Sequence, residues 1–158
     1  GVKHIEVGML ETDDVKGRTG FYDEVGVLRD TIQNHLMMML ALVAMETQSP
    51  VDEPTVRKDF FKLLPEVSSE HVVSLGQYKS YNNHVNEDRA KWDEPLLESP
   101  SKTPSYAHVT VTLSTEGAAP KYDWLQNVPV HFKSGKALSE RRSYVEVVFN
   151  SGLTLVFN

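Results

Sequence analysis

Four polar residues stand close together at the start of an otherwise apolar segment: Asp30, Gln33, Asn34 and His35. Burying such groups without partners would cost about 1–3 kcal/mol each, so a polar ligand or partner is expected to meet them. A histidine is suited to general base catalysis near neutral pH, because the ordinary pKa of imidazole is about 6.5. The alternative is a structural histidine held by a backbone carbonyl at the edge of the core. The spacing alone favours that alternative.

These residues are expected to lie near the start of one long helix. Asp23 and Glu24 are suited to its N-terminal turn, and Ser49-Pro50 is expected to end it. Apolar residues recur along one face at helical spacing, namely Val25, Leu28, Ile32, Leu36, Met39 and Val43. This spacing puts His35 on the flank of the apolar face, and we therefore expect a half-buried histidine.

A second candidate stretch is basic, although the chain as a whole is acidic. It holds Lys133, Lys136, Arg141 and Arg142 within ten residues. Gly135, at the end of a predicted strand, would let the backbone turn and bring Lys136 close to a ligand. Clustered cations at a strand end are suited to bind a phosphate or sugar phosphate. Taken alone, the stretch is more often a solvated basic loop.

Length and composition limit the class of protein. The 158 residues are enough for a single domain with a sizeable core, and we expect residues 1–158 to form one domain. The net charge of −6 argues against nucleic acid or an anionic membrane as partner. No apolar run is long enough to span a membrane. With no cysteine and no histidine pair at i, i+4, no metal site is expected.

The order of the predicted elements indicates an α+β fold, with a largely antiparallel sheet packed against two helices in the N-terminal half. A glycine-rich nucleotide-binding motif is missing from the sequence. The predicted helices cover 23–49 and 52–65, and a long polar loop covers 79–104. The predicted strands cover 2–10, 71–78, 106–113, 128–133, 144–149 and 153–157.

Together, these stretches resemble the glucose-6-phosphate dehydrogenase family. The resemblance rests on GRTGFYDEVGVLRD at 17–30, QNHL at 33–36, LGQY at 75–78 and SGKALSER at 134–141. Within the family, the motifs are most similar to the endoplasmic-reticulum hexose-6-phosphate dehydrogenases, which are fused to a 6-phosphogluconolactonase.

The resemblance implies a role for each candidate residue. His35 matches the family's catalytic base, which takes the proton from the C1 hydroxyl of glucose 6-phosphate as 6-phosphogluconolactone forms in the pentose phosphate pathway. Glu11 and Asp30 match positions that hold sugar hydroxyls. Lys136 and Arg141 match basic contacts to the substrate.

The resemblance also implies that this chain is a fragment of the C-terminal, substrate-binding and dimerisation domain. NADP would be bound mainly by an N-terminal dinucleotide-binding domain that the chain lacks, so the fragment is expected to be inactive. The parent protein is expected to form a homodimer in the endoplasmic reticulum lumen, with the cytoplasm as the alternative location. The competing hypothesis is a non-catalytic α+β binding or dimerisation module that has kept only the scaffold.

Overall fold

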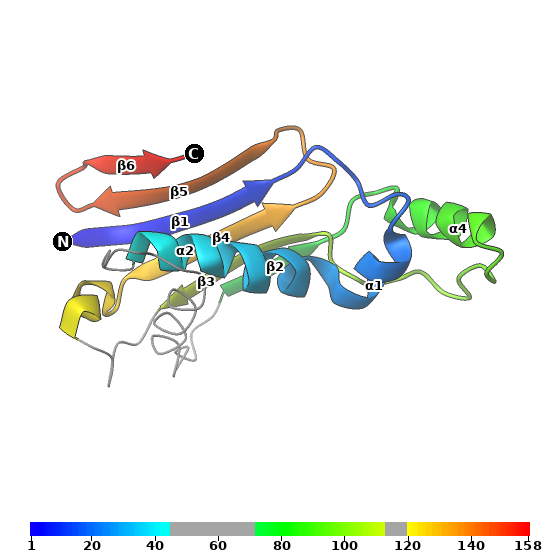
Figure 1. The fold of residues 1–158 in the computed structure, drawn as a ribbon, viewed down its shortest axis with the longest axis horizontal. Helices are drawn as coiled ribbons and strands as arrows, with labels where there is room; N and C mark the ends of the chain where they lie inside the picture. Colours follow the sequence, from blue (N-terminus) through cyan, green and yellow to red (C-terminus); the bar gives the residue numbers. More distant parts are fainter. Residues whose placement is uncertain (45–71, 113–119) are drawn as a thin grey trace, which may run out of the picture.

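A computed structural model of the chain describes residues 1–44, 72–112 and 120–158. One six-stranded sheet runs through the molecule, and helices cover one of its faces (Figure 1). The strands lie side by side in the order β2-β3-β4-β1-β5-β6. Their bounds are β1 Val2–Leu10, β2 Val72–Gly76, β3 Tyr106–Thr112, β4 Pro129–Gly135, β5 Arg142–Phe149 and β6 Thr154–Phe157. The predicted α+β fold is confirmed.

The sheet is antiparallel except at its centre, where β1 and β4 run parallel. Their register pairs Ile5 with Val130 and continues to Leu10 opposite Gly135. Because parallel strands end at the same edge of a sheet, the residues that follow Leu10 and Gly135 emerge next to each other. This pairing places Glu11, which follows β1, next to Lys136, which follows β4, although the two residues are far apart in the sequence.

Alternating side chains of the central strands form the core. Ile5, Val7, Val130 and Phe132 are buried, and they belong to the same apolar cluster as Leu36 of the helical layer. In each strand the intervening residues point to the opposite face of the sheet. The strand predictions are therefore confirmed within two residues at each end, apart from His71 and Leu113, which lie outside the described residues.

The predicted long helix is three helical segments. They are α1 (Thr19–Val27), the π-helix η1 (Leu28–Leu36) and α2 (Met37–Ala44). The prediction of one regular helix from Asp23 is wrong, because α1 begins earlier and Gly26 breaks it with φ 61° and ψ 175°. Only glycine adopts this backbone conformation readily. The rest of the predicted helix, and the whole helix predicted at 52–65, lie outside the described residues.

The segment predicted as a long polar loop contains a helix, α4 (Tyr81–Lys91). Its buried residues are Tyr81, Val85 and Asp88, so the inward face carries a carboxylate where an apolar side chain would be expected. Figure 1 shows α4 next to α1, beyond the end of the sheet. A short 3₁₀ helix, η2 (Pro120–Leu125), precedes β4. Among the described residues, no helix is long and apolar enough to cross a membrane.

Candidate active site

A buried ion pair joins the ends of the two parallel strands. Glu11 follows β1, Lys136 follows β4, and the ammonium of Lys136 donates a hydrogen bond to the Glu11 carboxylate. The Lys136 side chain is 4% exposed, and that of Glu11 is 20% exposed. A buried ammonium is costly unless a partner compensates its charge, and Glu11 supplies that partner. The structure thus brings together two of the predicted substrate-binding residues.

Backbone hydrogen bonds fix both residues. The Glu11 N–H donates to the Gly135 carbonyl at 3.0 Å, and the Lys136 N–H donates to the Ser105 carbonyl at 2.9 Å. The expected turn lies at Ala137, where φ is 54°, and not at Gly135. A Cβ at position 135 would lie 2.8 Å from Cδ2 of Tyr106. Gly135 is therefore needed because the tyrosine ring approaches the backbone closely.

Tyr22 of α1 connects the ion pair to Asp30. The Lys136 Nζ lies 6.0 Å from the centroid of the Tyr22 ring, which is 1% exposed. Burial raises the pKa of the Tyr22 hydroxyl above its usual value, and the carboxylates of Asp30 and Glu11 raise it further. Both carboxylates therefore act electrostatically on the same hydroxyl, and the ion pair of Glu11 with Lys136 lies next to the Tyr22 ring.

Arg141 lies at the same edge of the sheet but at its surface. It forms an ion pair with Asp13, and the two side chains are 59% and 63% exposed. The loop that carries Asp13 is tied to the turn after Lys136, because the Asp13 carbonyl accepts a hydrogen bond from the Ala137 N–H at 2.8 Å. The predicted position of Arg141 next to the site is consistent with this arrangement. Asp13, its partner, was not predicted.

His35 is exposed, and the expectation of a half-buried histidine is wrong. In a π-helix each turn takes up about one more residue than in an α-helix, because the N–H bonds the carbonyl five residues back. Thr31, Ile32 and Leu36 consequently face the core, and His35 faces solvent. Within the described ranges, no hydrogen bond or ion pair joins His35 to the other four candidate residues. It shares η1 with Asp30.

The start of α1 is held by Asp88 of α4. The carboxylate of Asp88 accepts hydrogen bonds from the Gly17 N–H at 2.7 Å, the Thr19 N–H at 3.2 Å and the Thr19 hydroxyl at 2.9 Å. Burial alone would raise the pKa of the Asp88 carboxyl, but these three hydrogen bonds outweigh burial and hold that pKa below its ordinary value. Asp88 thereby fixes the loop that leads from Glu11 to Tyr22.

The middle of α1 is held by the first residue of α4 and by the segment that precedes β3. Asp23 accepts a hydrogen bond from the Tyr81 hydroxyl at 2.9 Å, and its backbone carbonyl accepts one from the Thr103 hydroxyl at 2.7 Å. After the break at Gly26, the Val27 N–H donates to the Pro104 carbonyl at 3.1 Å. These contacts set the direction in which η1 leaves α1, and thus the position of Asp30.

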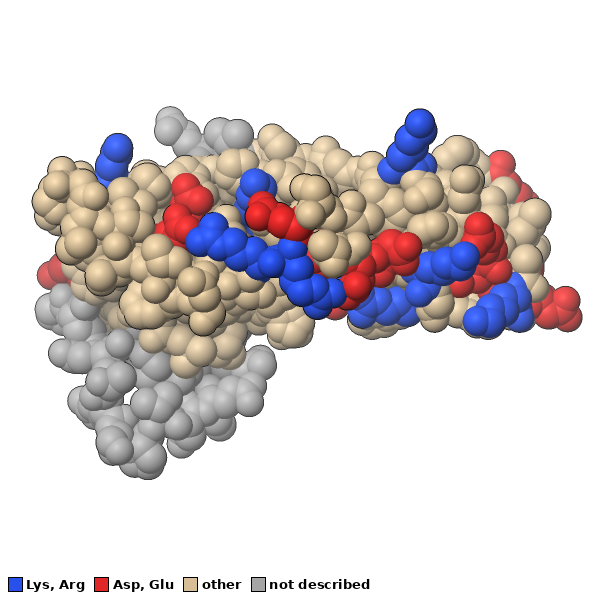
Figure 2. Space-filling view, turned by 90° about the horizontal axis from the view of Figure 1, so that it is seen from above, with Lys and Arg blue, Asp and Glu red and all other residues tan. Residues whose placement is uncertain are grey.

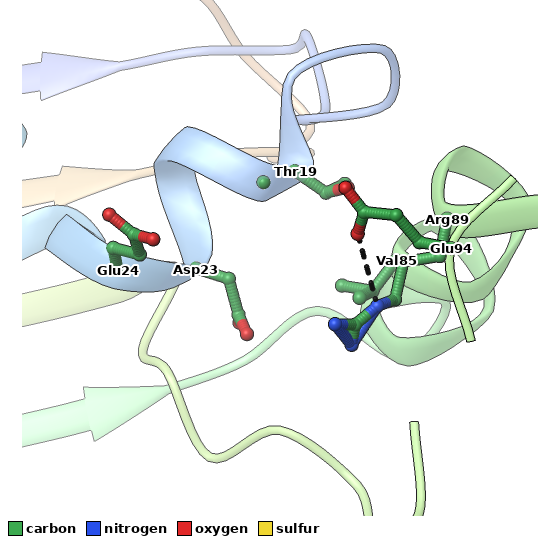
Figure 3. Close-up of a pocket in the computed structure, with 7 residues that line it drawn as sticks. Thr19, Asp23, Glu24, Val85, Arg89 and Glu94 are labelled. Atoms are coloured by element: carbon green, nitrogen blue, oxygen red, sulfur yellow. Dashed lines mark ion pairs between the residues drawn. The ribbon is translucent and has the colours of Figure 1, made fainter. Parts of the chain in front are cut away.

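A separate cavity of about 400 Å³ lies between α1 and α4. Figure 3 shows its side chains, and the dashed line joins the Arg89 Nε to a Glu94 carboxylate oxygen 3.6 Å away. Asp23, Glu24 and Glu94 contribute three carboxylates and Arg89 one guanidinium, so the lining is negative overall. A phosphate would be repelled there. None of the predicted substrate-binding residues lines this cavity.

The described residues offer no cluster of ligands for a metal ion. No group of three or more His, Asp or Glu side chains among them is arranged around a common point. A dinucleotide phosphate would need free N–H groups at a helix start. At the start of α1, however, the Thr19 N–H already bonds the Asp88 carboxylate, whose charge would repel a phosphate. The start of α1 therefore does not fit a dinucleotide phosphate.

Surface charge is mixed. On the face shown in Figure 2, basic and acidic side chains lie next to one another along the molecule, and no broad patch of one sign is visible. The exposed pair of Arg142 with Glu146 is one example of this mixing. The cation of the candidate site is thus a local feature at the sheet edge.

Comparison with known proteins identifies the family to which the chain belongs. The family model described as "Glucose-6-phosphate dehydrogenase, C-terminal domain" matches residues 1–158. This chain belongs to that family. A rabbit (Oryctolagus cuniculus) GDH/6PGL endoplasmic bifunctional protein is 40% identical over 95% of the chain and 18% of its own length. A glucose-6-phosphate 1-dehydrogenase of Ceratitis capitata is 36% identical over 94% of the chain and 27% of its own length.

Solved structures agree with this assignment to the glucose-6-phosphate dehydrogenase family. A crystal structure of the glucose-6-phosphate 1-dehydrogenase of Mycobacterium avium matches with a TM-score of 0.69 and 27% identity, over 93% of this chain and 29% of that one. A glucose-6-phosphate dehydrogenase in complex with its substrate glucose-6-phosphate shares the fold, with a TM-score of 0.64 and 24% identity. The chain spans less than a third of the length of these relatives.

Proposed function

We propose that this chain supplies the substrate-binding part of an NADP-dependent hexose-6-phosphate dehydrogenase. The parent would oxidise glucose 6-phosphate at C1 to 6-phosphogluconolactone, a reaction of the pentose phosphate pathway. The observation that carries the proposal is the buried ion pair of Glu11 and Lys136 beside Tyr22 and Asp30. It offers a cation for the substrate and two carboxylates for its hydroxyls at one edge of the sheet.

Each side chain has a defined task in this proposal. Glu11 and Asp30 accept hydrogen bonds from sugar hydroxyls and so orient the ring. Lys136 is fixed by its ion pair and gives the pocket a rigid positive charge. Arg141 is exposed, so it can leave Asp13 and contact the substrate when the sugar phosphate binds.

His35 is the proposed general base. Its task is to accept the proton of the C1 hydroxyl while the adjacent C–H bond releases its hydride. The exposed position of His35 on η1 leaves its ring free for such a contact. The site is therefore completed by a part of the parent that covers this surface of η1.

The start of α1 does not fit a dinucleotide phosphate, and we therefore assign NADP to a domain outside residues 1–158. Residues 1–158 would then be a fragment of the C-terminal domain, without dehydrogenase activity of its own. The parent is expected to be a homodimer, with no nucleic acid or membrane as partner. The rabbit relative supports the endoplasmic reticulum lumen as location, and an Arabidopsis thaliana relative described as cytoplasmic supports the alternative.

The test is a steady-state assay of the full-length parent. We expect reduction of NADP⁺ with glucose 6-phosphate as substrate, and a far lower rate with glucose, which lacks the phosphate. Arg141→Ala should raise KM for glucose 6-phosphate about tenfold, the effect of losing one charge-assisted contact. Arg142→Ala is the matched control, because Arg142 is an exposed arginine that pairs with Glu146. A wild-type parent without activity on glucose 6-phosphate would contradict the proposal.

A further inference from the structure

Tyr22 carries a hydroxyl whose role the proposed function does not yet explain. The side chain is 1% exposed, and its hydroxyl has no hydrogen-bond partner among the described residues. Leaving a buried hydroxyl unpaired costs about 1–3 kcal/mol relative to a paired one. Phenylalanine would fill the same space without that cost. An unpaired buried donor of this kind therefore points to a partner that is engaged only in another state of the site.

The surroundings of Tyr22 show which partner is available. Its ring packs in a small apolar cluster with Val15, Tyr81 and Val85, and the ring centroids of Tyr22 and Tyr81 are 6.4 Å apart. The Lys136 ammonium, 6.0 Å from the ring centroid, can donate to Glu11 but cannot accept a hydrogen bond. The carboxylates of Asp30 and Glu11 can accept one, and of the groups that act electrostatically on the Tyr22 hydroxyl these two have the largest effects.

Asp30 is the better acceptor of the two. Glu11 is already engaged by Lys136, whereas no hydrogen bond or ion pair of the Asp30 carboxylate is present among the described residues. Asp30 also has the stronger electrostatic effect on the Tyr22 hydroxyl. Because Asp30 is only partly buried, its side chain can rotate towards Tyr22 when a ligand fills the space outside it.

We propose that Tyr22 is a positioning residue of the sugar-phosphate site, whose hydroxyl donates a hydrogen bond to the Asp30 carboxylate when the hexose phosphate is bound. The bond holds one carboxylate oxygen in place and leaves the other to accept a sugar hydroxyl. Tyr22 remains a protonated donor at neutral pH, because burial and the neighbouring carboxylates raise its pKa. This inference rests on the proposed function, since it requires a hexose phosphate in the pocket.

The test uses the full-length parent with Tyr22→Phe, Asp30→Asn and the double variant. KM and kcat are measured with glucose 6-phosphate and with analogues that each lack one ring hydroxyl. Tyr22→Phe should raise KM for glucose 6-phosphate about tenfold and change kcat by less than about threefold. For the analogue that lacks the hydroxyl bound by Asp30, Tyr22→Phe should not raise KM. In the double variant, Tyr22→Phe should add no further increase in KM to that of Asp30→Asn.

Tyr81→Phe is the matched control. Tyr81 is another buried tyrosine of the same cluster, but its hydroxyl is already bonded to Asp23. Tyr81→Phe should lower the thermal stability and change KM by the same factor for glucose 6-phosphate and for every analogue. Tyr22→Phe should leave the thermal stability of the ligand-free protein unchanged or higher. An unchanged KM in Tyr22→Phe, or an equal increase for every analogue, would overturn the inference alone. A wild-type parent that does not oxidise glucose 6-phosphate would overturn the proposed function as well.

Discussion

Lys136 and Glu11 are 125 residues apart in the sequence, and their side chains form an ion pair at the adjoining ends of β4 and β1. The parallel register of these two strands, which pairs Leu10 with Gly135, produces this contact. The same pair lies at the edge of the sheet and supplies the cation of the candidate site. If the proposed function is correct, stability and substrate binding depend on the same two residues.

The first prediction concerns the free energy of this pair. Lys136→Met keeps the length of the side chain but leaves the Glu11 carboxylate without its partner. We expect the free energy of unfolding of this chain to fall by about 1–3 kcal/mol, as measured by urea denaturation. Adding Glu11→Gln should restore part of the loss, because the unpaired charge is then removed. If the effects of the two variants simply add, the residues are not coupled.

A second prediction concerns pH and Asp88. The pKa of Asp88 is lowered in the folded chain, so its ionised form stabilises the fold fully above the ordinary value of 3.8. That stabilisation is lost as the pH falls through the lowered pKa of the folded state. Asp88→Asn should therefore lower the free energy of unfolding by about 1–3 kcal/mol at pH 7. The loss should become progressively smaller below pH 3.8, as measured by denaturation at pH 7 and at several values below pH 3.8. An equal cost at every pH would show that the charge of Asp88 contributes nothing.

A third prediction concerns the break between α1 and η1. Gly26→Ala introduces a Cβ that would lie 3.1 Å from Thr103, at a backbone conformation with φ 61° that alanine adopts only with strain. We expect a loss of about 2–4 kcal/mol in the free energy of unfolding. Gly17→Ala is the control, because Gly17 also has positive φ, 86°, but open space around its Cβ. Gly17→Ala should lower the free energy of unfolding by less, because it introduces backbone strain without a steric contact.

Much of the sheet could be predicted from the sequence, because alternating apolar residues such as Ile5 and Val7 directly reflect a strand with one buried face. The pairing of β1 with β4 could not, because the two strands are far apart in the chain and nothing local to either encodes their register. The ion pair of Glu11 with Lys136 was therefore not predicted, because the family resemblance implied only that each residue contacts the substrate.

The helices were harder to predict for two physical reasons. Apolar residues at Ile32 and Leu36 fit an α-helix as well as a π-helix, so the turn that exposes His35 left no recognisable signal. In α4, Asp88 occupies a buried position and satisfies backbone N–H groups of another segment. Its polar sequence consequently resembled a loop. Tyr22 belongs to one of the family motifs but was not predicted to have a role of its own, because nothing local marks a tyrosine whose hydroxyl is buried without a partner.

The proposed role of His35 as the acceptor of the substrate's proton can be tested with His35→Asn in the full-length parent. Asparagine keeps much of the size and hydrogen-bonding capacity of histidine but cannot take the proton. Initial rates with glucose 6-phosphate and NADP⁺ should show kcat lower by about 10²–10⁴-fold with little change in KM. A kcat close to that of the wild type would contradict the claim and make His35 a surface residue without a catalytic role.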